Sequence, residues 1–122
     1  YLYVAEELKR KFPKLQRIAI TLRGSISASH NTWSGVLYDG RQLYTGPQYD
    51  IIPIVDRVGG GDAFAGGLIY SLIQDPEDFQ GALDFAVAAS CLKHSIWYDF
   101  NCASVAEVRG LLKSGGSGRV QR

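Results

Sequence analysis

Three consecutive glycines stand directly before a helix-forming apolar run in residues 55–72, VDRVGGGDAFAGGLIYSL. Gly59, Gly60 and Gly61 allow a tight turn and let another group approach the backbone closely. A helix that begins here has unpaired N–H groups and a partial positive charge at its start. The segment therefore predicts a turn into a helix that can bind a phosphate group.

Two common phosphate-binding loops do not match this segment. It lacks the Gly-Lys-Ser/Thr ending of a Walker loop. The dinucleotide-binding pattern G-x-G-x-x-G can start at Gly59 and Gly61, but Phe64 then stands where the third glycine is required. A phosphate-binding role for this segment therefore requires a different arrangement.

Asp62 follows the glycines and has two interpretations. In the first it is a plain N-cap of the helix. In the second it accepts a proton from a hydroxyl that attacks a bound phosphate, while the adjacent amides stabilise the transferred group. A carboxylate beside a phosphate is repelled by it, so this placement is expected only where the carboxylate performs such a task. The residues alone leave both interpretations open.

The rest of the chain alternates helical and extended patterns, which predicts an α/β fold. Asp39-Gly40 lies between two β-rich runs and predicts a hairpin. Ser104 with Glu107 predicts a capping box before a last helix. The other expected elements are a helix over 2–12 ended by Pro13, a strand over 17–22, an extended segment over 49–55 and helices over 63–73 and 77–95.

Composition gives no sign of a nucleic-acid or membrane partner. The 122 residues carry 13 basic and 12 acidic side chains. No apolar run is long enough to span a bilayer, and charges interrupt the N-terminal residues too early for a secretory signal. We therefore expect a cytoplasmic protein. Because the chain opens inside a helical pattern and without methionine, we also expect a piece of a longer protein.

Residues 56–67, DRVGGGDAFAGG, resemble the signature D-T-x-G-A-G-D of the ribokinase-like (PfkB) carbohydrate kinases. AITLRG precedes it where that family has the end of its nucleotide-binding strand, and ALDFAVAAS follows where the family has the helix beside adenine. AASCLKHSIWYDFN and SGRVQR look most like 2-keto-3-deoxygluconate kinases. The resemblance implies that residues 1–122 are the C-terminal nucleotide-binding and catalytic portion of a three-layer α/β/α fold, with the sugar-binding part and lid outside this chain.

This resemblance implies ATP-dependent phosphorylation of a sugar acid, most like 2-keto-3-deoxygluconate, to its 6-phosphate, with Mg²⁺. Asp62 would be the catalytic base, the three glycines the anion hole, and Asp99 a contact to the sugar acid. A kinase for fructose or ribose, or a non-catalytic nucleotide- or phosphate-binding module, remains an alternative. The nucleotide would be contacted by Thr21, Arg23, Gly24, Gly61, Val87 and Ser90, and Asp56 would belong to the monovalent-cation (K⁺) site of some members.

Several residues depart from the family pattern. Arg57 replaces a small Thr or Ser, and the loop TLRGSIS lacks the second glycine, which bears on the phosphate role of Gly24. Trp97-Tyr98 stands where many members have glycine, which weakens the cation site. We expect Lys93 and His94 to face solvent or phosphate, and His94, at a helix end, to be a favourable charged partner of the helix dipole and not a catalyst. We expect the chain by itself to lack kinase activity, and any homo-oligomer to form through regions outside it.

Overall fold

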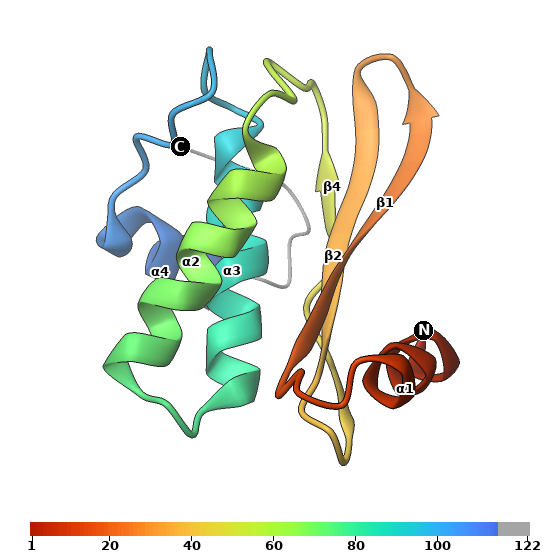
Figure 1. Ribbon diagram of the computed structural model, residues 1–122. Coiled ribbons are helices and arrows are strands. Elements are labelled where there is room, and N and C mark those ends of the chain that lie inside the picture. The colour runs from red at the N-terminus through yellow and green to blue at the C-terminus, as the bar shows by residue number, and fades with distance from the viewer. Residues whose placement is uncertain (115–122) are drawn as a thin grey trace.

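A four-stranded antiparallel sheet separates one helix from the other three (Figure 1). The computed structural model describes residues 1–114, so the Gly/Ser-rich tail and the SGRVQR motif lie outside the described residues. The elements are α1 (Leu2–Lys11), β1 (Ile18–Ser27), β2 (His30–Tyr38), β3 (Leu43–Thr45), β4 (Tyr49–Ile51), α2 (Gly60–Gln74), α3 (Phe79–Lys93) and α4 (Val105–Lys113).

The long strand β2 organises the sheet. It pairs with β1 along one edge, and along the other edge with β3 and β4 in succession. The predicted hairpin is confirmed: Tyr38 is opposite Leu43, and the Asp39 side chain accepts hydrogen bonds from the N–H groups of Arg41 and Gln42, both at 2.8 Å. Gly40 in this turn has a φ of +95°, which glycine adopts without strain.

The alternation of side chains along β2 explains the three layers. Trp33 and Leu37 face α3 and belong to the main core. Tyr38 faces the opposite way and packs with Ile18 of β1 and Ala5 of α1. Because successive strand residues point to opposite faces, one strand supplies both cores. The predicted α/β fold with helices on both faces of the sheet is confirmed.

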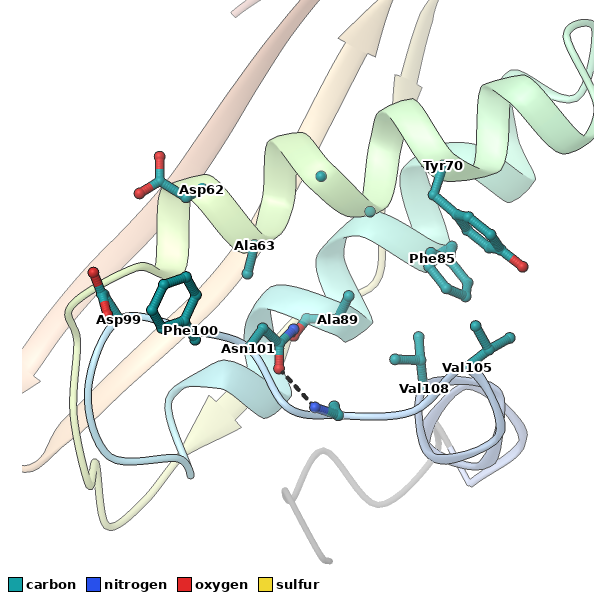
Figure 2. Close-up of a pocket in the computed structure, with 13 residues that line it drawn as sticks. Asp62, Ala63, Tyr70, Phe85, Ala89, Asp99, Phe100, Asn101, Val105 and Val108 are labelled. Atoms are coloured by element: carbon teal, nitrogen blue, oxygen red, sulfur yellow. Dashed lines mark hydrogen bonds between the residues drawn. The ribbon is translucent and has the colours of Figure 1, made fainter.

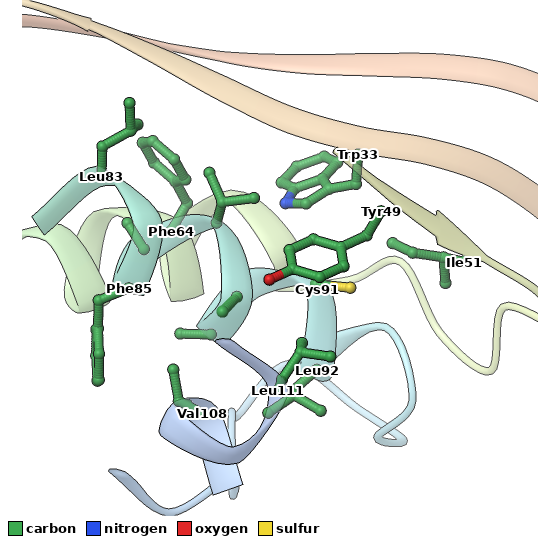
Figure 3. Packing of buried hydrophobic residues seen from close by; sticks show 14 of the residues in the cluster. Trp33, Tyr49, Ile51, Phe64, Leu83, Phe85, Cys91, Leu92, Val108 and Leu111 are labelled. Atoms are coloured by element: carbon green, nitrogen blue, oxygen red, sulfur yellow. The ribbon is translucent and has the colours of Figure 1, made fainter. Parts of the chain in front are cut away.

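Helices α2 and α3 run antiparallel to each other (Figure 1). Figure 3 shows the buried hydrophobic residues that pack around them. At Gly67 of α2, an added Cβ would lie 3.2 Å from the Cα of Ala86 in α3, so the missing side chain permits close contact. The predicted start of α2 at Ala63 is wrong, because the helix begins at Gly60 and includes two of the glycines. The predicted range 77–95 is also too long, since Asp78 caps α3 by accepting from Gly81 N–H at 2.9 Å.

The capping box at α4 is confirmed by both of its hydrogen bonds. The Ser104 hydroxyl accepts from Glu107 N–H, and the Glu107 carboxylate accepts from Ser104 N–H, each at 3.1 Å.

Within residues 1–114, no helix has the length and apolar character needed to cross a bilayer.

A buried hydrogen bond joins β2 to α3. The indole N–H of Trp33 donates to the Ser90 hydroxyl at 2.7 Å, and that hydroxyl donates to Ala86 carbonyl oxygen at 2.7 Å. Ser90→Ala should lower the free energy of unfolding by about 1–3 kcal/mol, because the buried indole N–H then lacks an acceptor. Urea denaturation measures this. Ser25→Ala, at an exposed position of β1, is the control, and an equal small effect of both would contradict the prediction.

Candidate active site

The glycine loop leads directly into α2. Gly59 is the N-cap, with a left-handed φ of +82°. The Gly60 N–H donates a hydrogen bond to the Arg57 carbonyl oxygen at 3.2 Å. The first hydrogen bond of the helix is donated by the Ala63 N–H to the Gly59 carbonyl oxygen at 2.9 Å. No hydrogen bond among residues 1–114 uses the N–H groups of Gly61 and Asp62. These two donors are therefore the part of the turn that can bind an anion.

Asp62 does not cap α2, so the interpretation as a plain N-cap is wrong. It is the third residue of the helix and is exposed. Within the described residues its carboxylate accepts no hydrogen bond. A carboxylate that is free of local bonds at the start of a helix remains available to a ligand.

The three glycines have different surroundings. A Cβ on Gly59 would overlap the carbonyl oxygen of Asp99, and a Cβ on Gly60 would lie 3.0 Å from the His94 ring. At Gly61 nothing lies within 4 Å of the added Cβ. The first two glycines are thus required by packing, whereas the third faces open space.

Hydrogen bonds hold the glycine loop against the segment that follows α3. The carbonyl oxygen of His94 accepts from Val55 N–H at 2.9 Å and from Asp56 N–H at 3.2 Å. The Asp56 carboxylate accepts from Val58 N–H at 3.0 Å and from Tyr98 N–H at 2.9 Å. These bonds, with a contribution from the Lys93 charge, hold the pKa of Asp56 below its usual value. Asp56 thus joins the two segments.

Lys93 and His94 are both buried, which contradicts the expectation that they face solvent or a phosphate. The His94 Nδ1–H donates to Ser90 carbonyl oxygen at 2.7 Å, and the ring packs on Trp33 with centroids 4.8 Å apart. Burial lowers the pKa of His94, and the charges of Lys93, Arg57 and Arg23 lower it further. The imidazole is therefore neutral near pH 7, and the expected charged partner of a helix end is also wrong.

A pocket of about 330 Å³ opens beside the start of α2 (Figure 2). Asp62 and Asp99 lie together at one end of it, with Phe100 beside them. Tyr70 and Phe85 lie at the other end. The pocket is therefore polar at the end where the two aspartates lie and apolar farther along α2.

Asn101 fixes the loop that carries Asp99. Its side-chain amide donates to Ala89 carbonyl oxygen at 3.0 Å, and its side-chain oxygen accepts from Ala103 N–H at 3.1 Å. Sequence reasoning missed Asn101 and Phe100. The signal available in the sequence was the aromatic run WYDF around Asp99. In the structure Trp97, Tyr98 and Phe100 are all exposed.

The expected nucleotide contacts are not brought together at this pocket. Arg23 and Gly24 line a separate depression of about 470 Å³, and Thr21 is exposed on β1. Gly24 N–H donates to the Thr32 hydroxyl at 3.1 Å, so this N–H is already used. Val87 and Ser90 have no exposed surface. A nucleotide could contact these two side chains only if the core opened.

The chain is similar to solved structures of carbohydrate kinases. A 2-dehydro-3-deoxygluconokinase from Thermotoga maritima shares 45% sequence identity over 93% of this chain, with a TM-score of 0.86. A PfkB family carbohydrate kinase from Listeria grayi shares 33% identity over 88%, with a TM-score of 0.82. A protein provisionally assigned as a 2-keto-3-deoxygluconate kinase, from Enterococcus faecalis, shares 28% over 88%, with a TM-score of 0.77.

These similarities confirm the predicted resemblance to the ribokinase-like (PfkB) carbohydrate kinases. Among those kinases, the resemblance extends to the 2-dehydro-3-deoxygluconokinase of Thermotoga maritima, whose substrate name is a synonym of 2-keto-3-deoxygluconate. This chain spans 33%, 33% and 31% of the lengths of the three structures, in the order given. No protein-family model and no curated protein matches the sequence.

The surroundings of the glycines predict different effects of alanine on stability. Gly59→Ala should lower the free energy of unfolding by at least about 2 kcal/mol, because it combines a left-handed φ with overlap at Asp99. Gly61→Ala should change it by less than about 1 kcal/mol. Gly66→Ala, at another open position of α2, is the control. Urea denaturation followed by circular dichroism compares the three, and equal losses at Gly59 and Gly61 would contradict the packing assignment.

Proposed function

We propose that the protein containing this chain is an ATP-dependent sugar-acid kinase that converts 2-keto-3-deoxygluconate to its 6-phosphate. One observation carries the proposal. The unbonded Asp62 carboxylate follows the free N–H group of Gly61, at the end of a pocket that Asp99 also lines. The Thermotoga maritima structure, a 2-dehydro-3-deoxygluconokinase, supports the choice of substrate.

In this proposal Asp62 accepts the proton of the attacking sugar hydroxyl. The Gly61 and Asp62 N–H groups donate to the oxygens of the transferred phosphoryl group and stabilise its charge. Among residues 1–114 there is no group of three or more His, Cys, Asp or Glu side chains placed to hold a metal ion. Mg²⁺ would bind through the nucleotide phosphates together with one or two carboxylates, as it commonly does at kinase sites.

Positive side chains near the loop favour the same reaction. Arg23 and Arg57 are close enough to His94 to lower its pKa, and the His94 ring lies directly behind Gly60. In this proposal their charge would add to the attraction of the phosphates toward the loop. Thr21 and Arg23 stay as proposed nucleotide contacts, whereas Val87 and Ser90 take no part because they are buried.

Asp99 is proposed to bind the hydroxyl end of the sugar acid. Its carboxylate shares the polar end of the pocket with Asp62 (Figure 2). Two carboxylates would repel the acid group of the substrate, so that group must point away from them. A basic side chain from outside residues 1–122 would hold the acid end.

Asp62→Asn should lower kcat by about 10²–10⁴-fold in the protein that includes the sugar-binding part, because the amide cannot act as a base. ATP affinity should change little, and stability by no more than about 1 kcal/mol, since only a favourable charge in the first turn is lost. Steady-state kinetics and urea denaturation measure both. Asp75→Asn, beyond the opposite end of α2, is the control. Normal turnover by Asp62→Asn would favour the non-catalytic phosphate-binding module.

Asp99→Ala should raise the KM for the sugar acid about tenfold or more and leave the KM for ATP nearly unchanged. A charge-assisted hydrogen bond contributes about 1.5–3 kcal/mol, and 1.4 kcal/mol is a factor of ten in affinity. Varying each substrate in turn separates the two constants. An unchanged KM for the sugar acid would make Asp99 a solvated loop residue and would favour another sugar, such as fructose or ribose.

A further inference from the structure

Lys93 is a charged residue without exposed surface at the end of α3. Its ammonium donates to the carbonyl oxygen of Ile96 at 2.8 Å. Lysine is almost never fully buried unless it is paired, because an ammonium loses its hydration there. One hydrogen bond to a carbonyl oxygen compensates for only a small part of the lost hydration, so the position of the charge requires another explanation.

The buried charge lies where the glycine loop meets the segment after α3. Asp56 is on the other side of this junction, and its carboxylate is bound to the N–H groups of Val58 and Tyr98. The Lys93 charge is close enough to lower the pKa of Asp56. A carboxylate, a carbonyl oxygen and a positive charge thus occur together at one junction.

The family resemblance places a monovalent cation at Asp56, and the residues present do not fit one. Hard cations need several oxygen ligands. The Ile96 carbonyl oxygen already accepts from Lys93, and each Asp56 carboxylate oxygen accepts from a backbone N–H. A cation added here would also be repelled by the buried ammonium.

We propose that the Lys93 ammonium takes the place of the monovalent cation at Asp56, so that the glycine loop is held in position without bound K⁺. The lysine is attached to α3, so its ammonium cannot dissociate from the junction as a bound ion would. The proposal rests on the proposed kinase function only for its kinetic consequence, which is activity that does not require K⁺.

The first experiment compares cations on the unmodified protein. The melting temperature is measured in KCl and in tetramethylammonium chloride at equal ionic strength. We expect equal values, because no site takes up K⁺. A melting temperature that rises specifically with K⁺ would overturn the proposal. This measurement is independent of catalysis, so it decides the question even if the protein is not a kinase.

The second experiment uses Lys93→Met, which keeps most of the apolar stem and removes the charge. We expect the melting temperature to fall by about 4 °C or more, and KCl but not tetramethylammonium chloride to restore part of the loss. Thallium(I), an anomalous scatterer that substitutes for K⁺, should bind near Ile96 carbonyl oxygen in crystals of the variant and not in those of the unmodified protein.

Lys113→Met, at an exposed position of α4, is the control and should show neither effect. A folded Lys93→Met variant that gains no response to K⁺ would overturn the proposal, because Lys93 would then be an ordinary core residue. If this variant does not fold, the comparison of cations on the unmodified protein still decides. In the active kinase, removal of K⁺ should leave kcat unchanged, and loss of activity on removal would also overturn the proposal.

Discussion

The site depends on the contact between Gly59 and the carbonyl oxygen of Asp99. It joins the loop that begins α2 to the segment that follows α3, and any side chain at Gly59 would separate them. The same contact brings the Asp62 carboxylate and the Asp99 carboxylate to one end of the pocket. The glycine run is therefore needed first for backbone contact, and only Gly61 is left to face a ligand.

Arg57 shows how a departure from the family pattern can be accommodated. Its guanidinium donates to Ala28 carbonyl oxygen at 2.9 Å and to the Asn31 side-chain oxygen at 3.3 Å. The loop before α2 is thereby tied to the turn between β1 and β2. A Thr or Ser is too short to make this connection. The substitution therefore replaces a small residue by one that links the glycine loop to the sheet.

Local signals in the sequence were sufficient where the relevant contacts are local. The Asp39-Gly40 hairpin and the Ser104 capping box were predicted because their hydrogen bonds join neighbouring residues. The burial of Lys93 could not be predicted, because it depends on where α3 ends relative to the glycine loop. The family resemblance associated Val87 with the nucleotide, yet here its buried side chain lies against Gly35 of β2. Motif matches locate such a residue in the chain but do not determine which face of the helix it occupies.

The antiparallel arrangement of α2 and α3 has an electrostatic consequence. The N-terminus of α2 carries roughly half a positive elementary charge, and the C-terminus of α3 beside it carries roughly half a negative one. At a distance of several ångströms, the electrostatic potentials of these two helix ends largely cancel. In the proposed reaction, long-range attraction of a phosphate would come from side-chain cations near the loop, among them the exposed Arg23 and Arg57, and it would weaken as salt screens them. In that proposal the N–H groups of Gly61 and Asp62 would act only once the anion has arrived, so capture and final positioning would be carried out by different groups.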